Sequence, residues 1–203
     1  MKKTEIILAV IALVGLLFKC FHLPFGGLLT TISFFGLACF YMYFSFALFN
    51  NIPFKKLFKK ESYTADISEV LDYRILIAVF SGVSLSIMLA GLLYYFMFWP
   101  NSFFMISVGI TLLFIIMIIS LIRFFKTKST FYTRIFIRMA VIGGIALFFR
   151  LMPNTTWLEI QYREHPEYIK AMKNLWKDPN NIELQKEVDE YWYNMHKDKM
   201  KDK

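Results

Sequence analysis

Residues Ile75 to Ile122 read ILIAVFSGVSLSIMLAGLLYYFMFWPNSFFMISVGITLLFIIMIISLI, and this stretch decides the fold class. Its 48 residues contain no charged side chain, and the group Trp99-Pro100-Asn101-Ser102 is the one break in them. A helix needs about 20 predominantly apolar residues to cross the hydrocarbon core of a bilayer. The stretch therefore predicts two transmembrane helices joined by a tight turn.

Two more charge-free runs precede this stretch, from Ile6 to Phe18 and from Thr30 to Asn51. A fifth apolar segment, Phe131 to Met152, has 22 residues, or about 33 Å of helix. We expect it to span fully, and a re-entrant or interfacial helix is the alternative. Its charged residues would have to snorkel toward the two interfaces: Arg134, Arg138 and Arg150.

The composition excludes an ordinary soluble domain, because 57% of the residues are hydrophobic and 19% are aromatic. The predicted fold class is all-α, a polytopic membrane protein with five transmembrane helices and a C-terminal extramembrane helical hairpin. Its expected parts are a first transmembrane hairpin (1–50), a basic loop (51–74), a second hairpin (75–124), a loop with the fifth helix (125–153) and an amphipathic tail (154–203).

Basic residues indicate the topology, because cytoplasmic loops carry an excess of Lys and Arg. Lys2 and Lys3 precede the first span, which no small-x-small cleavage site follows, and further basic clusters follow the second and fourth spans. The turns Leu23–Gly26 and Trp99–Ser102 carry no charge. We expect a cytoplasmic N-terminus and a tail on the opposite side of the membrane. The formal charge of +8 is then a topology signal and not a nucleic-acid patch.

One pattern occurs three times, as Gly15 to Pro24, Gly91 to Pro100 and Gly144 to Pro153. Each copy runs from a Gly to a Pro nine residues later and closes an apolar segment. This self-similarity predicts a duplicated membrane element. Since Pro ends helices generically, coincidence is the alternative.

Small residues form a face on the third span, where they allow a second backbone to approach closely. We expect this face to pack within the bundle, with a homo-oligomer contact as the alternative. The residues are spaced four apart: Ala78, Gly82, Ser86 and Ala90.

The tail alternates charged residues with apolar residues at helical spacing on both sides of Asp178–Asn181. Pro166 can begin the first helix, and Asn180 with Glu183 offers a capping box for the second. We expect an antiparallel hairpin packed apolar face to face. The bilayer or a partner protein could cover those faces instead.

Lys19 and His22 are the sharpest candidate functional residues, because at i, i+3 they share one face of the first helix. An intramembrane cation is costly and indicates a functional site by default. Lys19 could instead snorkel outward while His22 bonds within the turn. Arg150, nearer a helix end, is predicted to be an interfacial anchor.

The pattern Gly15-x-x-Phe18-Lys19-x-x-His22-x-Pro24, followed by a second apolar helix, resembles the transmembrane hairpin of the gliding-motility L protein. That family forms the membrane motor of the type IX secretion system in Bacteroidetes. The resemblance covers roughly residues 5–50 and implies a related hairpin in a bacterial inner membrane. With five spans in that membrane, the tail would lie in the periplasm. The family carries a carboxylate in its second span, whereas this chain has none between Glu5 and Glu61.

No catalytic, cofactor or metal motif stands out, and Cys20 and Cys39 differ in expected depth by roughly 12 Å, too far for a disulfide. We therefore expect a non-enzymatic structural or assembly subunit without cofactors. Its partners would be the lipid bilayer and a membrane or envelope protein, or further copies of itself. The alternative is an ion- or proton-coupled motor or channel-like subunit that uses Lys19 and His22.

Overall fold

A computed structural model of the chain describes residues 1–52, 72–99, 101–153 and 155–201, and its regular elements there are all α-helices. The predicted all-α fold class is confirmed for these residues. Most of the expected 51–74 loop lies outside them. The helices are α1 (Lys2–Cys20), α2 (Gly26–Phe49), α5 (Asp72–Phe96), α6 (Ser102–Thr127), α7 (Thr130–Leu151), α8 (Thr156–Gln161), α9 (Pro166–Lys177) and α10 (Ile182–Lys201).

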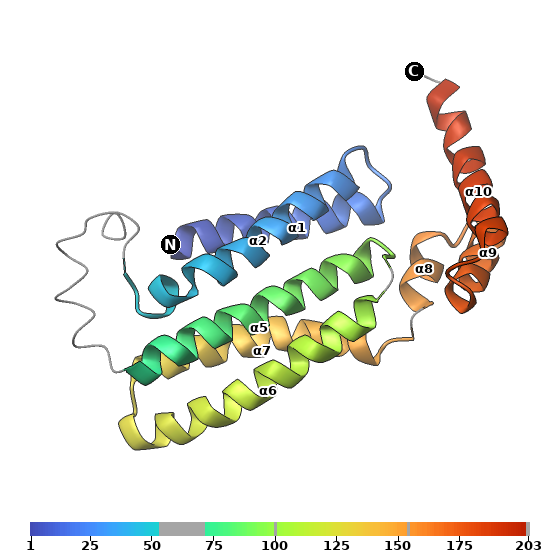
Figure 1. Cartoon of the computed structure of the whole chain (residues 1–203). Helices are drawn as coiled ribbons and strands as arrows, with labels where there is room; N and C mark the ends of the chain where they lie inside the picture. The colour runs from blue at the N-terminus through green and yellow to red at the C-terminus, as the bar shows by residue number, and fades with distance from the viewer. Residues whose placement is uncertain (53–71, 100, 154, 202–203) are drawn as a thin grey trace. The chain divides into compact units, whose positions relative to one another are not determined.

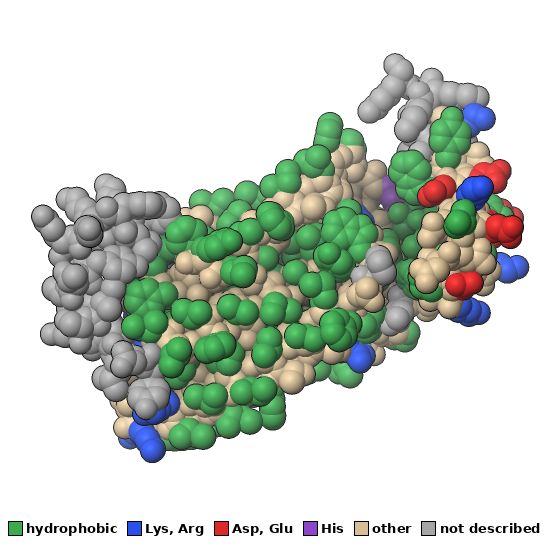
Figure 2. All heavy atoms as spheres, in the orientation of Figure 1, with side chains coloured by type: hydrophobic (Ala, Val, Ile, Leu, Met, Phe, Trp, Pro, Cys, Tyr) green, Lys and Arg blue, Asp and Glu red, His purple; other side chains and the backbone are tan. Residues whose placement is uncertain are grey.

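The chain divides into two compact units. We call Met1–Leu151 the bundle and Met152–Lys203 the tail unit. In Figure 2 the visible face of the bundle is mainly hydrophobic, whereas acidic side chains gather on the tail unit. Each unit is therefore built from the residue types that suit its expected surroundings, lipid for one and water for the other.

Three helices of the bundle are long and apolar enough to cross a membrane: Gly26–Phe49, Arg74–Phe96 and Ser102–Thr127. They support a membrane protein. The remaining two expected spans carry more charge along their length, with Lys2, Lys3, Glu5 and Lys19 in α1 and three arginines in α7. Length and composition thus support three of the five expected spans.

The long helices of the bundle pack against their neighbours in the chain as far as α6, and α7 returns to lie beside α5 (Figure 1). α2 contacts α1 and α5, α5 also contacts α6, and α7 packs against α5 and α6. α5 is accordingly the central helix, with Ala78, Leu85 and Met88 fully buried. α6 instead exposes large side chains such as Phe104 and Phe125, as a lipid-facing helix would.

Glycines allow the closest helix contacts, since they have no Cβ to hold the backbones apart. A Cβ added at Gly15 would lie 2.8 Å from the backbone nitrogen of Thr30 in α2. One added at Gly91 would lie 2.9 Å from that of Ile106 in α6. Each glycine thus lets the second helix of its hairpin pack directly against the first.

The predicted small-residue face of α5 lies partly against α2. A Cβ at Gly82 would overlap the Ser45 side chain and the carbonyl oxygen of Tyr41. Ala78 and Ser86 are buried as well, and Ala90 is half-buried. At Gly82, therefore, a helix of the same bundle occupies this face.

The turns of the two hairpins are alike residue by residue, at a constant separation of 76 positions. Left-handed backbone occurs at His22 (φ 51°) and at Phe98 (φ 58°). The next N–H in each turn donates five residues back, Leu23 to Phe18 at 2.8 Å and Trp99 to Tyr94 at 2.9 Å. Both turns are Schellman motifs with a non-glycine residue at the left-handed position.

The third copy of the repeat departs from the other two. α1 and α5 end four residues before Pro24 and Pro100, whereas α7 continues to Leu151, two residues before Pro153. Gly144 also differs, because nothing lies within 4 Å of a Cβ added there. The repeated pattern thus forms a helical hairpin in two of its copies, and in the third it ends the single helix α7.

In the tail unit, α9 and α10 contact each other as the predicted helical hairpin requires. Tyr168, Met172 and Val188 are buried. The predicted capping box of Asn180 and Glu183 is wrong by one residue. The Asn181 side-chain oxygen accepts from the N–H of Glu183 at 3.0 Å, because α10 begins at Ile182 and the cap precedes the first helical residue.

Candidate functional site

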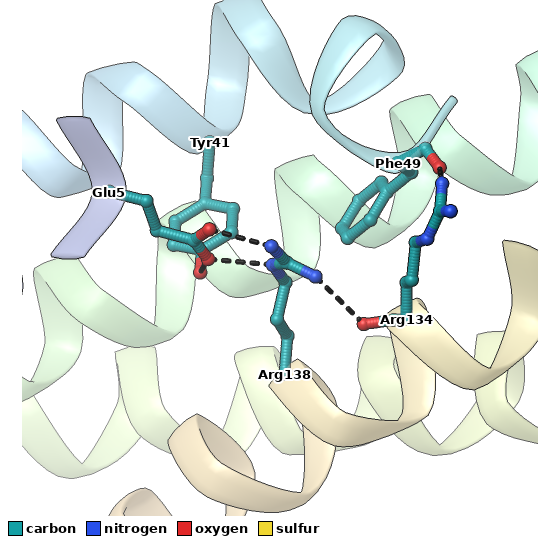
Figure 3. Close-up of polar contacts among 5 residues, drawn as sticks. All are labelled: Glu5, Tyr41, Phe49, Arg134 and Arg138. Atoms are coloured by element: carbon teal, nitrogen blue, oxygen red, sulfur yellow. Dashed lines mark hydrogen bonds and ion pairs between the residues drawn. The ribbon is translucent and has the colours of Figure 1, made fainter. Parts of the chain in front are cut away.

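A largely buried ion pair joins α7 to α1 at one end of the bundle (Figure 3). Arg138 Nε donates to Glu5 Oε1 and Arg138 Nη2 to Glu5 Oε2, each at 2.6 Å. The side chains are 14% and 13% exposed. This two-point contact fixes the guanidinium and carboxylate planes relative to each other, which makes it among the stronger protein hydrogen-bond geometries.

Neighbouring groups complete the coordination of this pair. The Tyr41 hydroxyl of α2 donates to Glu5 Oε1, and Arg138 Nη1 donates to the Arg134 carbonyl at 3.1 Å. The Arg138 guanidinium also lies over the Phe49 ring, 5.6 Å from its centroid. We call Glu5, Tyr41 and Arg138 the polar clamp. It joins α1, α2 and α7.

The chemistry available to the polar clamp follows from its satisfied bonding. Glu5 accepts from two partners, and three Arg138 nitrogens donate to acceptors on α1 and α7. With these bonds made, the clamp holds α1, α2 and α7 together.

The expectation that Arg138 snorkels to an interface is wrong, because its side chain turns inward to Glu5. Arg134 lies nearer the helix end, where Nη1 donates to the Phe49 carbonyl at 3.4 Å. Glu5 is a residue that our sequence analysis missed. The charges of the sequence could have indicated it. Glu5 is the one acidic residue among the first 60, and the charged residues of the fifth segment, which need a partner, are all arginines.

Lys19 lies at the opposite end of the bundle and reaches from α1 to α5. Its ammonium group donates to the carbonyl of Phe96, the last residue of α5, and lies 3.3 Å from the Met97 sulfur. It is also 5.1 Å from the centroid of the Phe98 ring. A cation at a helix C-terminus neutralises unpaired carbonyls and the negative end of the helix dipole.

The i, i+3 spacing predicted that His22 and Lys19 share one helix face, and the structure does not place them so. α1 ends at Cys20, and His22 takes the left-handed position of the turn, where its N–H donates to the Lys19 carbonyl at 3.1 Å. Its side chain is exposed. The structure therefore does not bring the two side chains together as a helical pair.

Arg150 is exposed near the end of α7. Its Nε donates to Ser107 Oγ of α6 at 2.9 Å, and its guanidinium lies 5.3 Å from the Phe103 ring centroid. The two contacts join α7 to the first turns of α6. Arg150 thus binds a neighbouring helix as well as facing outward.

Aromatic rings fill the space between the repeat copies at this end. Tyr95, which corresponds to Lys19 in the second copy, lies 5.2 Å from Phe149 of α7. Phe96 is 4.9 Å from the same ring. The two contacts are equivalent in the repeat. Lys19 of the first copy binds the carbonyl of Phe96, the residue after Tyr95, and the Tyr95 ring of the second copy packs on Phe149 of the third.

In the part of the chain that the structure describes, no three His, Cys, Asp or Glu side chains lie together as metal ligands. Cys20 and Cys39 are both free thiols. The polar clamp joins helices at one end of the bundle. Lys19 joins α1 to α5 at the other end, where Arg150 also joins α7 to α6.

Comparison of the chain with protein-family models, with curated proteins and with solved structures gave no match.

Proposed function

We propose that the chain is an integral membrane structural or assembly subunit, without enzymatic activity, that binds protein partners through its helices and its tail. The observation that carries this proposal is the position of Lys19. Its ammonium group is bound to the C-terminus of α5 and to neighbouring groups of the same bundle. A cation used in this way stabilises the packing of two hairpins and is poorly placed to pass ions.

The five-span topology with a cytoplasmic N-terminus is part of the proposal. Lys19 beside the first turn contacts Phe96 and Met97 beside the second. Both uncharged turns therefore lie at one end of the bundle, as two hairpins with cytoplasmic basic loops require. α7 as a fifth span places the tail unit on the far side, which is the periplasm if the membrane is a bacterial inner membrane.

The resemblance of residues 5–50 to the gliding-motility L protein hairpin suggests the setting of such a subunit. In that family the hairpin belongs to a membrane complex, so we expect a partner within the membrane or the envelope. The tail unit offers exposed aromatic side chains for this purpose, with Trp192 44% and Tyr193 57% exposed. Exposed aromatic residues are enriched where proteins bind each other.

An ion-coupled subunit is the competing proposal, and a flux measurement separates the two. Purified protein in lipid vesicles is compared with Lys19→Met and His22→Ala variants, using a pH-sensitive dye under an imposed proton gradient. A structural subunit gives no flux above protein-free vesicles, while Lys19→Met lowers the melting temperature. Proton flux that Lys19→Met abolishes without a change in melting temperature would establish the ion-coupled role instead.

Partner binding is tested in cells with a photo-crosslinking amino acid in place of Tyr193. An assembly subunit yields a discrete adduct after irradiation. The control replaces Tyr43, a tyrosine of α2 in the bundle that is 74% exposed. Equal adduct patterns from both positions would argue against binding through the tail.

A further inference from the structure

The polar clamp connects helices that are far apart in the sequence, since Glu5 and Arg138 are separated by 133 residues. We propose that the Glu5 carboxylate is required for α7 to cross the membrane, because it neutralises Arg138 inside the bundle. Without Glu5, α7 stays on the cytoplasmic side and the tail does not cross. This inference rests on the five-span topology proposed above.

The depth of Arg138 creates the need for a partner. It follows Thr130, the first residue of α7, by eight positions, or about 12 Å along the helix. The side chain bonds the Arg134 carbonyl, one turn nearer to that end, through Nη1. It points into the bundle, where two of its nitrogens contact Glu5.

α7 cannot neutralise this charge itself. Its charged residues are all arginines: Arg134, Arg138 and Arg150. The sequence has no Asp or Glu between Asp72 and Glu159, so α6 and α7 lack a carboxylate of their own. Glu5 supplies the one carboxylate bound to Arg138 among the described residues.

The order of synthesis fits this role. Chains fold and insert from the N-terminus onward, so α1 is in place before α7 is made. Tyr41 of α2 donates to Glu5 and is also made before α7. The acceptor site for Arg138 is therefore complete when α7 arrives.

Side-of-membrane labelling tests the inference in the full-length chain. A single cysteine is placed at exposed Asn194 in a Cys20→Ala, Cys39→Ala background, and an impermeant thiol reagent is applied to intact and to lysed cells. We expect labelling in intact cells for this parent, and its loss in Glu5→Gln, which should label only after lysis. Glu5→Gln makes the N-terminus more basic, so the orientation of α1 is not weakened.

Two further variants make the result specific. Glu5→Gln combined with Arg138→Met removes both charges and should restore labelling in intact cells. Glu159→Gln removes an exposed carboxylate of the tail unit and should leave labelling unchanged. If degradation reduces the amount of the Glu5→Gln protein in the cells, recovery of both the protein amount and the labelling in the double variant supports the inference. A double variant with as little protein as Glu5→Gln overturns it.

The remaining outcomes separate the two proposals. Labelling of Glu5→Gln in intact cells, equal to the parent, overturns the role of Glu5 and leaves the topology standing. Labelling of the parent only after lysis overturns the five-span topology, and the proposed role of Glu5 falls with it.

Discussion

At the scale of single residues, Arg138 is a charge that lipid alone would disfavour in the proposed topology, in which α7 crosses the membrane. An arginine at the centre of a membrane helix raises the insertion free energy by about 2.5–3.5 kcal/mol on translocon scales. Two 2.6 Å contacts with Glu5 replace the lost water. A buried ion pair adds little net stability, but removing one partner is strongly destabilising because it leaves the other charge buried and unpaired.

The Tyr41 hydroxyl should contribute measurably to the polar clamp, because it donates to a charged acceptor and the residue is 2% exposed. Tyr41→Phe keeps the ring and should lower the free energy of unfolding in detergent by about 1.5–3 kcal/mol, as for bonds to charged groups. Circular dichroism during denaturation measures this. Tyr43→Phe is the matched control, since Tyr43 lies on the same helix and is 74% exposed. Equal losses in both variants would refute the role of Tyr41.

Single residues were the hardest feature to predict from sequence. Lys19 and Arg150 stood out because charges in apolar segments are conspicuous, but their contacts with Phe96 and Ser107 depend on which helices pack together. Glu5 was hidden for the opposite reason. It lies beside Lys2 and Lys3 at a chain end, where a carboxylate resembles an ordinary solvated residue, and its partner is 133 positions away.

At the scale of elements, the sequence repeat predicted more than its residue identities suggested. His22 and Phe98 are chemically unlike, yet both take left-handed backbone and occupy the same place in a Schellman turn. In the second turn the Tyr94 and Trp99 rings, 5.0 Å apart, supply the hydrophobic contact that accompanies this motif. The spacing of Gly and Pro therefore predicted the likeness of these two turns better than the residue types did. The different end of α7 could not be predicted, since its sequence pattern matches the other copies.

The repeat glycines should respond differently to a methyl group. Gly91→Ala places a Cβ 2.8 Å from the Ile106 side chain and 2.9 Å from its backbone nitrogen, and should lower stability by about 1–3 kcal/mol through overpacking. Gly144→Ala meets nothing within 4 Å and should be neutral, or stabilising by up to about 1 kcal/mol through helix propensity. Thermal unfolding of both purified variants measures the difference. Destabilisation of similar size at Gly144 would contradict the open position of that face.

At the scale of the whole molecule, hydropathy identified the bundle because membrane helices are defined by local sequence. Three helices meet the length and composition that a span requires, and the boundary between bundle and tail unit falls near the shift to charged residues after Pro153. The order in which the helices pack was harder to predict from the sequence. Which helix lies at the centre depends on contacts such as Gly82 against Ser45, and these join hairpins that the sequence shows only as separate apolar runs.

The tail unit should respond to alkaline pH as a unit of its own. Burial raises the pKa of Tyr168, and the nearby Tyr162 raises it further, so the folded unit holds the phenol proton more tightly than the unfolded chain, whose pKa is near 10. This contribution to stability is complete below pH 10 and is lost as the pH rises above it.

Tryptophan fluorescence can follow this loss, because Trp157, Trp176 and Trp192 lie in the tail unit and Trp99 alone in the bundle. Raising the pH above 10 should change the fluorescence while most of the helical circular dichroism, which the bundle supplies, remains. Tyr168→Phe removes the titrating group and should reduce the pH dependence, whereas Tyr193→Phe, at an exposed position, should preserve it. A fluorescence change unaltered by Tyr168→Phe would assign the alkaline transition to another group. Loss of fluorescence and helicity together would mean that the two units unfold as one, and the compact division of the chain at Met152 would then have no counterpart in its stability.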